Sequence, residues 1–224
     1  MSLTLRELIN PTPNDAVKGY TLERDTCYRT FLGACSWLKP EPYLVLNWAL
    51  DTIGRRWMDK RQNIQAVILD ACPKGFNIDC ADADGRLRHP PGTHKSGYTV
   101  DLCYYTTGAH NCTQTVGDVK RIELFDANGQ LLLDPTGKFW ILDVERNFEL
   151  YCILFTAFPK GRCHVDARIG KRIIEWGKNH RKINLSGWTQ CDDLQTSEKY
   201  NHWGHGHMVL EGTCNWDVVL RLAA

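Results

Sequence analysis

Residues 200–208 read YNHWGHGHM and place three of the chain's eight histidines within six positions. The three are His202, His205 and His207, spaced by three residues and then by two. A histidine on a surface or in a core usually stands alone. Imidazoles gathered this closely indicate a metal site, a proton relay, or both, because histidine is a common metal ligand and titrates near neutral pH.

We expect this stretch to lead into a final strand over residues 205–210. Side chains two positions apart share one face of a strand, so His205 and His207 would project together while Met208 and Leu210 face apolar packing. On an α-helix the two imidazoles would point about 200° apart and could not bind one ion. Two histidines are too few for a catalytic zinc, which usually has three protein ligands and one water.

Residues 92–102, GTHKSGYTVDL, are the best source of further ligands. His94 closes a long loop, and Asp101 lies in the middle of a strand that we expect over residues 99–105. Gly97 lets the chain turn, so that His94 can fold back beside Asp101. A carboxylate between two apolar strand residues needs a partner, and a divalent cation is one such partner.

The order of the expected elements favours an α+β fold, an antiparallel β-sheet with flanking helices. Strands and helices do not alternate regularly, which argues against a doubly wound parallel sheet. The sequence has no internal repeat, low-complexity tract or linker, and its 224 residues suit a single domain over residues 1–224. Residues 1–42 are rich in turn formers and are expected to be an irregular N-terminal extension packed on that domain.

Apolar periodicity and turn formers predict the individual elements. Helices follow from apolar residues at helical spacing and from a capping aspartate, and strands follow from short apolar runs beside turn formers. The Asn128-Gly129 pair indicates a tight hairpin turn. The expected helices cover residues 43–57, 143–155 and 165–176, and the expected strands cover residues 66–71, 99–105, 121–126, 130–134 and 205–210.

The composition is that of an ordinary globular protein. The chain is 43% hydrophobic and 24% charged, with a formal net charge of +1. This balance argues against a nucleic-acid-binding protein, which usually carries a basic face or arm. No apolar run is long enough to span a bilayer. The first residues, MSLTLRELINPTPND, lack the pattern of a secretory signal, so either the protein is made without one or a signal was removed.

The ten cysteines leave two interpretations open. None forms a CxxC pair, so a zinc knuckle or a thioredoxin-type site is not indicated. Spacings such as Cys103 with Cys112 and Cys152 with Cys163 could close local loops by disulfides in an oxidising compartment, which is the interpretation that we favour. The alternative is that the cysteines are reduced and serve as small hydrophobic residues.

These motifs resemble the zinc peptidases of the LAS group, named after lysostaphin, D-Ala-D-Ala peptidases and the sonic hedgehog signalling domain. Their shared signature is H-x6-D followed later by HxH, which corresponds here to His94 with Asp101 and to His205 with His207. Within that group the sequence is most similar to the penicillin-insensitive murein endopeptidases, which have a further histidine where His202 stands. The resemblance covers residues 66–210.

The resemblance implies a hedgehog/D-Ala-D-Ala peptidase-like fold and one Zn²⁺ ion held by His94, Asp101 and His207, with water as the fourth ligand. By the same resemblance, His205 would stabilise the carbonyl oxygen or transfer a proton to the leaving amine, and His202 would orient or polarise. The implied reaction is hydrolysis of peptide cross-links of peptidoglycan by metal-activated water. Such a murein endopeptidase has no serine to acylate and would be insensitive to β-lactams.

Residues near these motifs are candidates for contact with the substrate, and one position departs from the family pattern. Arg88, or alternatively Arg86, in the loop before His94 could bind a peptide carboxylate, although loop arginines are often merely solvated. Trp203 adjoins the histidine cluster and could form a groove wall or pack in the core. Pro91 stands where the murein endopeptidases have another histidine, so any role of that residue does not carry over. The remaining single histidines, His89, His110, His164 and His180, are interpreted as loop or helix-end residues.

Other functions fit parts of the pattern. A D-Ala-D-Ala or L,D-type carboxypeptidase, or a phage endolysin, would use the same scaffold. A non-catalytic binding module could retain the zinc site, as the hedgehog resemblance allows. A cupin oxidoreductase would match HxH-x3-E over residues 205–211, but only 13 residues follow, too few for the rest of a barrel. We expect a periplasmic or secreted protein, or a cytoplasmic one if it is a phage-type lysin; the sequence leaves the oligomeric state open.

Overall fold

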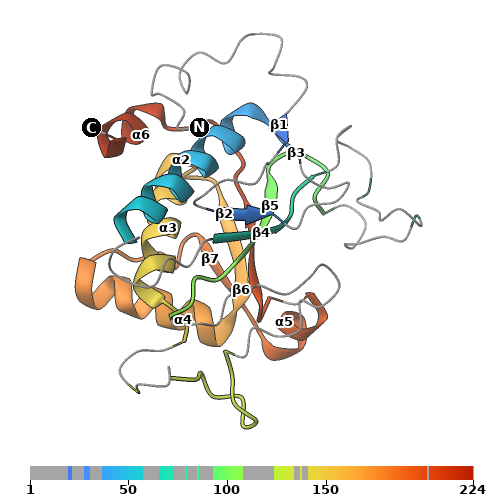
Figure 1. The fold of residues 1–224 in the computed structure, drawn as a ribbon, viewed down its shortest axis with the longest axis vertical. Helices are drawn as coiled ribbons and strands as arrows, with labels where there is room; N and C mark the ends of the chain where they lie inside the picture. The colour runs from blue at the N-terminus through green and yellow to red at the C-terminus, as the bar shows by residue number, and fades with distance from the viewer. Residues whose placement is uncertain are drawn as a thin grey trace.

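The computed structural model describes residues 20–21, 28–30, 37–57, 66–72, 79, 85, 93–107, 124–133, 137, 141–200 and 202–223 (Figure 1). The strands are β1 (Tyr20–Thr21), β2 (Tyr28–Thr30), β3 (Trp37–Leu38), β4 (Ala66–Asp70), β5 (Thr99–Cys103), β6 (Arg162–Asp166), β7 (Thr189–Asp192) and β8 (His205–Val209). The helices are α2 (Pro40–Trp57), α3 (Val144–Ala157), α4 (Ala167–Trp176), the π-helical turn η1 (Gly177–Arg181), α5 (Leu194–Tyr200) and α6 (Trp216–Ala223).

Six strands of the described chain form one sheet in the order β2-β4-β5-β8-β6-β7. The three central pairings are antiparallel and the two outer pairings are parallel. Each parallel pair is joined by a crossover that contains a helix, α2 at one edge and α4 at the other, because parallel neighbours need a long connection. The expected mixture of helices with a mainly antiparallel sheet is confirmed, whereas a wholly antiparallel sheet is wrong at both edges.

Helices α2, α3 and α4 form a layer against one face of this sheet, with α3 at its centre (Figure 1). Helix α3 contacts α2, α4 and α6, and Figure 1 shows α2, α3 and α4 together beside the strands. The contact with the sheet is close, because a Cβ atom at Gly206 in β8 would lie 2.8 Å from Tyr151 Oη of α3. His205 and His207 flank Gly206 and therefore project from the opposite face of the sheet.

Helix α2 buries the four apolar residues whose spacing predicted it. Leu46, Leu50, Ile53 and Trp57 are each 5% exposed or less. The helix begins at Pro40, three positions before the expected start. Proline is favoured in a first turn because the N–H that it lacks would have no partner within the helix.

Helix α3 begins at the predicted cap, Asp143. Its Oδ1 accepts a hydrogen bond from the backbone N–H of Arg146 at 3.1 Å. One turn into the helix, the Asn147 side chain accepts from Tyr105 N–H at 3.0 Å and donates to the Tyr105 carbonyl at 2.9 Å. These bonds attach the start of α3 to the chain just beyond β5, the strand that carries Asp101.

The helix expected over residues 165–176 is wrong at its beginning. Val165 belongs to β6, and α4 starts only after Asp166, whose side chain caps it. Cys163 and Val165 are fully buried, whereas His164 between them is partly exposed. This alternation with a period of two is that of a strand covered on one face by helices.

The N-terminal 42 residues contain sheet structure and are not wholly irregular. Strand β2 joins the edge of the main sheet beside β4, and β1 pairs with β3 in a separate antiparallel pair. Strand β2 reads Tyr28-Arg29-Thr30, and tyrosine and threonine are residue types enriched in strands.

The predicted turn at Asn128-Gly129 is present, but long hairpin strands are not seen beside it. Gly129 has a φ of 73°, and the Asp126 N–H donates to the Gln130 carbonyl at 2.8 Å. Within residues 124–133 the pairing is a single antiparallel bridge between Phe125 and Leu131. Residues 121–123 and 134, which complete the expected strands, lie outside the described part of the chain.

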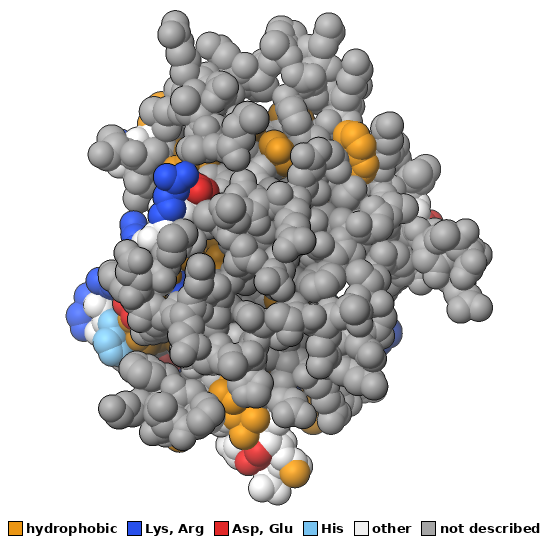
Figure 2. Space-filling view, in the orientation of Figure 1, with side chains coloured by type: hydrophobic (Ala, Val, Ile, Leu, Met, Phe, Trp, Pro, Cys, Tyr) orange, Lys and Arg blue, Asp and Glu red, His pale blue; other side chains and the backbone are white. Residues whose placement is uncertain are grey.

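The described surface has mixed character. In Figure 2 the Lys and Arg side chains at the left edge stand beside acidic and hydrophobic groups. Arg181 of η1, for example, pairs with Glu145 at 3.3 Å and with Glu149 at 3.8 Å on α3. None of the described helices combines the length and the apolar character required to cross a membrane.

We predict that Gly206→Ala destabilises the protein, because a methyl group would lie 2.8 Å from Tyr151 Oη and 3.0 Å from Cys163 Sγ. Overpacking of this kind costs about 1–3 kcal/mol, which corresponds to a Tm lower by about 2–12 °C for a chain of this size. Gly187→Ala is the matched control, because nothing lies within 4 Å of a Cβ at that position. Calorimetry measures both variants, and an unchanged Tm for Gly206→Ala would contradict the close contact of β8 with α3.

Candidate metal centre

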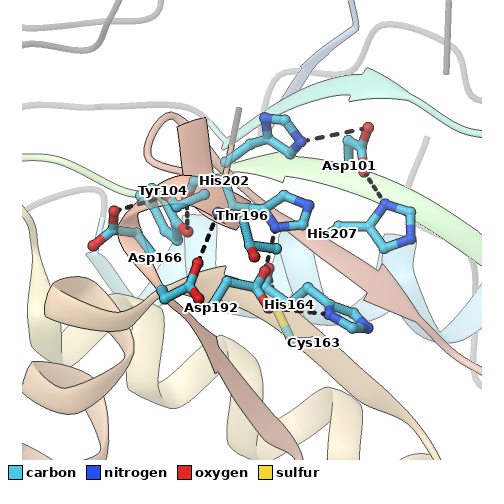
Figure 3. Close-up of polar contacts among 12 residues, drawn as sticks. Asp101, Tyr104, Cys163, His164, Asp166, Asp192, Thr196, His202 and His207 are labelled. Carbon is cyan, nitrogen blue, oxygen red and sulfur yellow. Dashed lines mark hydrogen bonds and ion pairs between the residues drawn. The ribbon is translucent and has the colours of Figure 1, made fainter. Parts of the chain in front are cut away.

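Asp101 and His207 are direct neighbours across two strands. They pair in the antiparallel ladder of β5 and β8, and His207 Nδ1 lies 2.9 Å from Asp101 Oδ1. Figure 3 shows the two side chains pointing toward one another above the sheet. Residues 106 positions apart along the chain are thus brought together by strand pairing.

His94 reaches the same point from the loop before β5. Its φ is 52° and that of Gly97 is 82°, so two left-handed residues reverse the chain ahead of the strand, as the glycine led us to expect. The residue is 1% exposed, and its Nδ1 lies 2.9 Å from the Ala71 carbonyl, to which it donates. Its Nε2 then faces Asp101 Oδ2 at 3.3 Å and His207 Nδ1 at 3.2 Å.

The donor atoms of these three residues have the spacing of ligands around one small cation. His207 Nδ1 lies 2.9 Å from Asp101 Oδ1 and 3.2 Å from His94 Nε2, and His94 Nε2 lies 3.3 Å from the other carboxylate oxygen, Asp101 Oδ2. Tetrahedral zinc with bonds of about 2.0–2.1 Å holds its ligand atoms about 3.3 Å apart. His94, Asp101 and His207 therefore form a group that could hold a metal ion, and the chemistry of two imidazoles and a carboxylate fits zinc.

Asp101 keeps its charge although it is buried. Removal from water would raise the pKa of this carboxyl, but the charges of His94, His205 and His207, with the hydrogen bond from His207, hold the pKa well below 3.8. An ionised carboxylate is the form that binds a divalent cation. The charge that a metal ion requires is thus already present in the sheet.

His205 faces the same carboxylate from the end of β8. Its Nε2 lies 3.6 Å from Asp101 Oδ2, and the residue is 6% exposed. This distance is longer than a hydrogen bond. The imidazole is therefore adjacent to the three ligand candidates but outside their group.

His202 lies beside the ligand candidates and bonds to a residue on another strand. Its Nδ1 lies 2.5 Å from Asp192 Oδ2 in β7, and its ring centroid is 5.8 Å from that of His207 and 5.6 Å from that of His205. His164 Nδ1 lies 3.5 Å from the other oxygen of Asp192. Figure 3 shows Asp192 joined by dashed lines to both imidazoles. Two further histidines are thus tied to one carboxylate beside the metal group.

His164 and Asp192 are the site residues that the sequence analysis missed. The helix expected over residues 165–176 concealed the strand that pairs His164 with His207. The alternation of polar and apolar residues over Arg162–Asp166 is the signal that could have revealed it. For Asp192 no such signal exists, because Thr189–Asp192 has no apolar alternation of its own.

Burial lowers the pKa of both imidazoles that contact Asp192. Loss of hydration is the largest cause for His202 and for His164, and it takes each pKa below 6.5, while the charge and hydrogen bond of Asp192 oppose the decrease. Just below pH 6.5 the unfolded chain therefore binds more protons than the folded chain. The stability associated with these groups is present above pH 6.5 and is lost as the pH falls below that value.

Of the two residues expected to contact a substrate, Arg88 and Trp203, the structure describes only Trp203. Arg88, like Arg86 and Pro91, lies outside the described residues. Trp203 lies in the turn between α5 and β8, directly after His202, and is partly exposed. Its contact with a substrate stays a prediction.

The described thiols do not support the local disulfide expected between Cys152 and Cys163, because both are free. Cys112, the expected partner of Cys103, lies outside the described residues, so that pairing stays a prediction. Cys72 is close to the metal group, and its Sγ accepts a hydrogen bond at 3.2 Å from the backbone of the turn before β5. Burial raises the pKa of Cys72 to about 11, so the thiol is protonated at neutral pH.

No model of a protein family matches the chain, and no curated protein matches it significantly. The arrangement of the side chains, with the resemblance of the motifs, is therefore the basis for proposing a function.

We predict that the metal-free protein binds one zinc ion and that Asp101→Asn or His207→Ala weakens binding by at least about 100-fold, because loss of a mere supporting residue already costs 10–100-fold. Calorimetric titration measures the affinity. Zinc at about 100 times its Kd should also raise the stability by about 2.7 kcal/mol. The control is His180→Ala, which changes an exposed histidine of η1 that stacks on Trp176 of α4. This variant should bind zinc like the wild type. Unchanged binding by Asp101→Asn would contradict the site.

We predict that Asp192→Asn lowers the pKa of His202 and of His164 further, because it removes the charge that opposes the effect of burial. NMR titration of the metal-free protein measures both values. Asp217→Asn, which changes an exposed carboxylate on α6, is the control and should alter neither. A higher pKa for His202 in Asp192→Asn would show that the carboxylate is not its partner in solution.

Proposed function

We propose that this chain is a zinc-dependent peptidase that hydrolyses peptide cross-links of peptidoglycan, in the manner of the murein endopeptidases that its motifs resemble. The observation that carries the proposal is the convergence of His94, Asp101 and His207, whose donor atoms lie as far apart as ligands around one tetrahedral ion. His94 and Asp101 are buried and His207 is partly exposed, and charged groups in such surroundings are usually paired or bound to a metal.

The ligand set supports a catalytic use of zinc. Structural zinc sites have four protein ligands, whereas the three candidates that the described part of the chain offers would leave a position for water or substrate. When bound, zinc supplies Lewis-acid chemistry to a peptide carbonyl at neutral pH. The hydrogen bond from His94 Nδ1 to the Ala71 carbonyl leaves Nε2 as the nitrogen that would bind a metal ion, which is the usual support for a ligating histidine.

His205 is the residue best placed to act on the scissile peptide. Its Nε2 lies 3.6 Å from Asp101 Oδ2, beside the group of His94, Asp101 and His207 and not part of it. From there it would stabilise negative charge on the carbonyl oxygen or give a proton to the leaving amine. His202, held by Asp192, would orient or polarise the reacting groups from the adjacent turn.

The substrate class comes from the resemblance alone. It implies a cross-link between D-alanine and a diamino acid, with Arg88 and Trp203 as candidates for binding it. Peptidoglycan lies outside the cytoplasmic membrane, so a periplasmic or secreted location goes with this function, and a cytoplasmic one with a phage-type lysin.

The test of the proposal is incubation of zinc-loaded protein with purified peptidoglycan, followed by mass spectrometry of the released muropeptides. We expect cross-linked dimers to be converted to monomers, a reaction stopped by a chelator and unaffected by β-lactams. Release of free D-alanine alone would instead identify a carboxypeptidase on the same scaffold. Zinc binding without any hydrolysis would contradict the peptidase and leave a binding module.

We predict that His205→Ala reduces turnover by at least about 100-fold, the usual contribution of a general acid or base, while the zinc content is unchanged. The reason is that His205 lies outside the ligand group. Muropeptide release and metal analysis measure the two quantities, with His180→Ala as the control. Loss of zinc from His205→Ala would make this residue a ligand and contradict its assignment.

A further inference from the structure

Asp192 joins two histidines that the metal group does not use. It ends β7, and its side chain is 12% exposed. One carboxylate oxygen lies 2.5 Å from His202 Nδ1 and the other lies 3.5 Å from His164 Nδ1. Each oxygen thus faces a different imidazole, and both imidazoles are near the ring of His207, at 5.8 and 5.9 Å between centroids.

The backbone of His202 is held as firmly as its ring. Its N–H donates to the Ser197 carbonyl of α5 at 2.9 Å. Its carbonyl accepts from Tyr104 Oη, just beyond β5, at 2.6 Å and from the Asp166 N–H of β6 at 3.3 Å. With Asp192 of β7, four parts of the fold therefore fix one residue of a short turn.

The bond to Asp192 does something that the backbone bonds cannot do. Backbone bonds place the turn, but only a partner for the ring decides which nitrogen carries the proton and which way the ring points. With Nδ1 as donor to the carboxylate, a neutral His202 has its acceptor nitrogen at Nε2. The ring then stands 5.6 Å from that of His205 in one tautomer and one orientation.

We infer that Asp192 is a positioning residue for the peptide hydrolysis proposed above, and that it acts through His202; the inference rests on that proposed function. Correct orientation of a group beside the substrate contributes to the rate and not to ground-state binding. His164 is the weaker partner, because its contact with Asp192 is at the limit of a hydrogen bond and its side chain is 31% exposed. It provides a matched control on the same carboxylate.

The experiment is a double-mutant cycle on the zinc-loaded protein. His202→Asn keeps a donor near the place of Nδ1 and lacks Nε2, whereas His202→Gln reaches the place of Nε2 and lacks the donor near Asp192. We expect Asp192→Asn to lower kcat by about 10–100-fold, as loss of a supporting residue does, with KM and zinc content unchanged. His202→Asn should lower kcat equally, and the double variant should be no worse than either.

The controls separate positioning from a merely structural role. In a His164→Asn background, Asp192→Asn should retain its full effect on kcat, and Asp192→Glu should recover part of the activity. If His202→Asn keeps the wild-type kcat, or if Asp192→Asn lowers kcat as much in the His202→Asn background as in the wild type, Asp192 only anchors the fold and the inference is overturned.

A second readout does not depend on activity. ¹⁵N NMR of the imidazoles should show His202 as the Nδ1–H tautomer in the wild type, with that preference lost in Asp192→Asn. A wild-type His202 protonated at Nε2 instead would overturn the inference even if peptidoglycan is cleaved. If peptidoglycan is not cleaved at all, the proposed function fails, and the tautomer measurement still decides whether Asp192 sets the ring.

Discussion

The register between β5 and β8 is the constraint on which the candidate metal centre depends. It places Asp101 opposite His207 in an antiparallel ladder. A slip of one residue would turn the side chains of one strand to the wrong face. The register is held from the other side of the sheet, where Val100, Leu102 and Met208 are 2% exposed or less. The hydrophobic packing under the sheet thus fixes the polar geometry above it.

The parts of the site that could be predicted from sequence are those with local signals. A period of two fixes the common face of His205 and His207, and Gly97 supplies the turn that brings His94 to Asp101. The α2 helix and the cap at Asp143 likewise follow from short-range patterns, because helical spacing and capping involve neighbours in sequence. Each of these features depends on residues that are close together in the sequence.

The parts that could not be predicted depend on which strands pair. Nothing in Thr189–Asp192 states that it lies parallel to β6, and only that pairing brings Asp192 to the site. The parallel edges of the sheet follow from the α2 and α4 crossovers, whose direction is a property of the whole fold. His164 is a different case: the alternation over Arg162–Asp166 could have revealed its strand, but only the pairing with β8 places it beside His207.

The separation of His94 from His207, 113 residues along the chain, links the site to assembly of the domain. Contacts of such range are costly in chain entropy and become favourable only when the intervening structure has formed. In a chain emerging from the ribosome, the three candidate ligands come together only when strand β8 inserts between β5 and β6. Only the folded domain would then bind the cation. A bound ion would stabilise the domain against separation of the central strands β5 and β8.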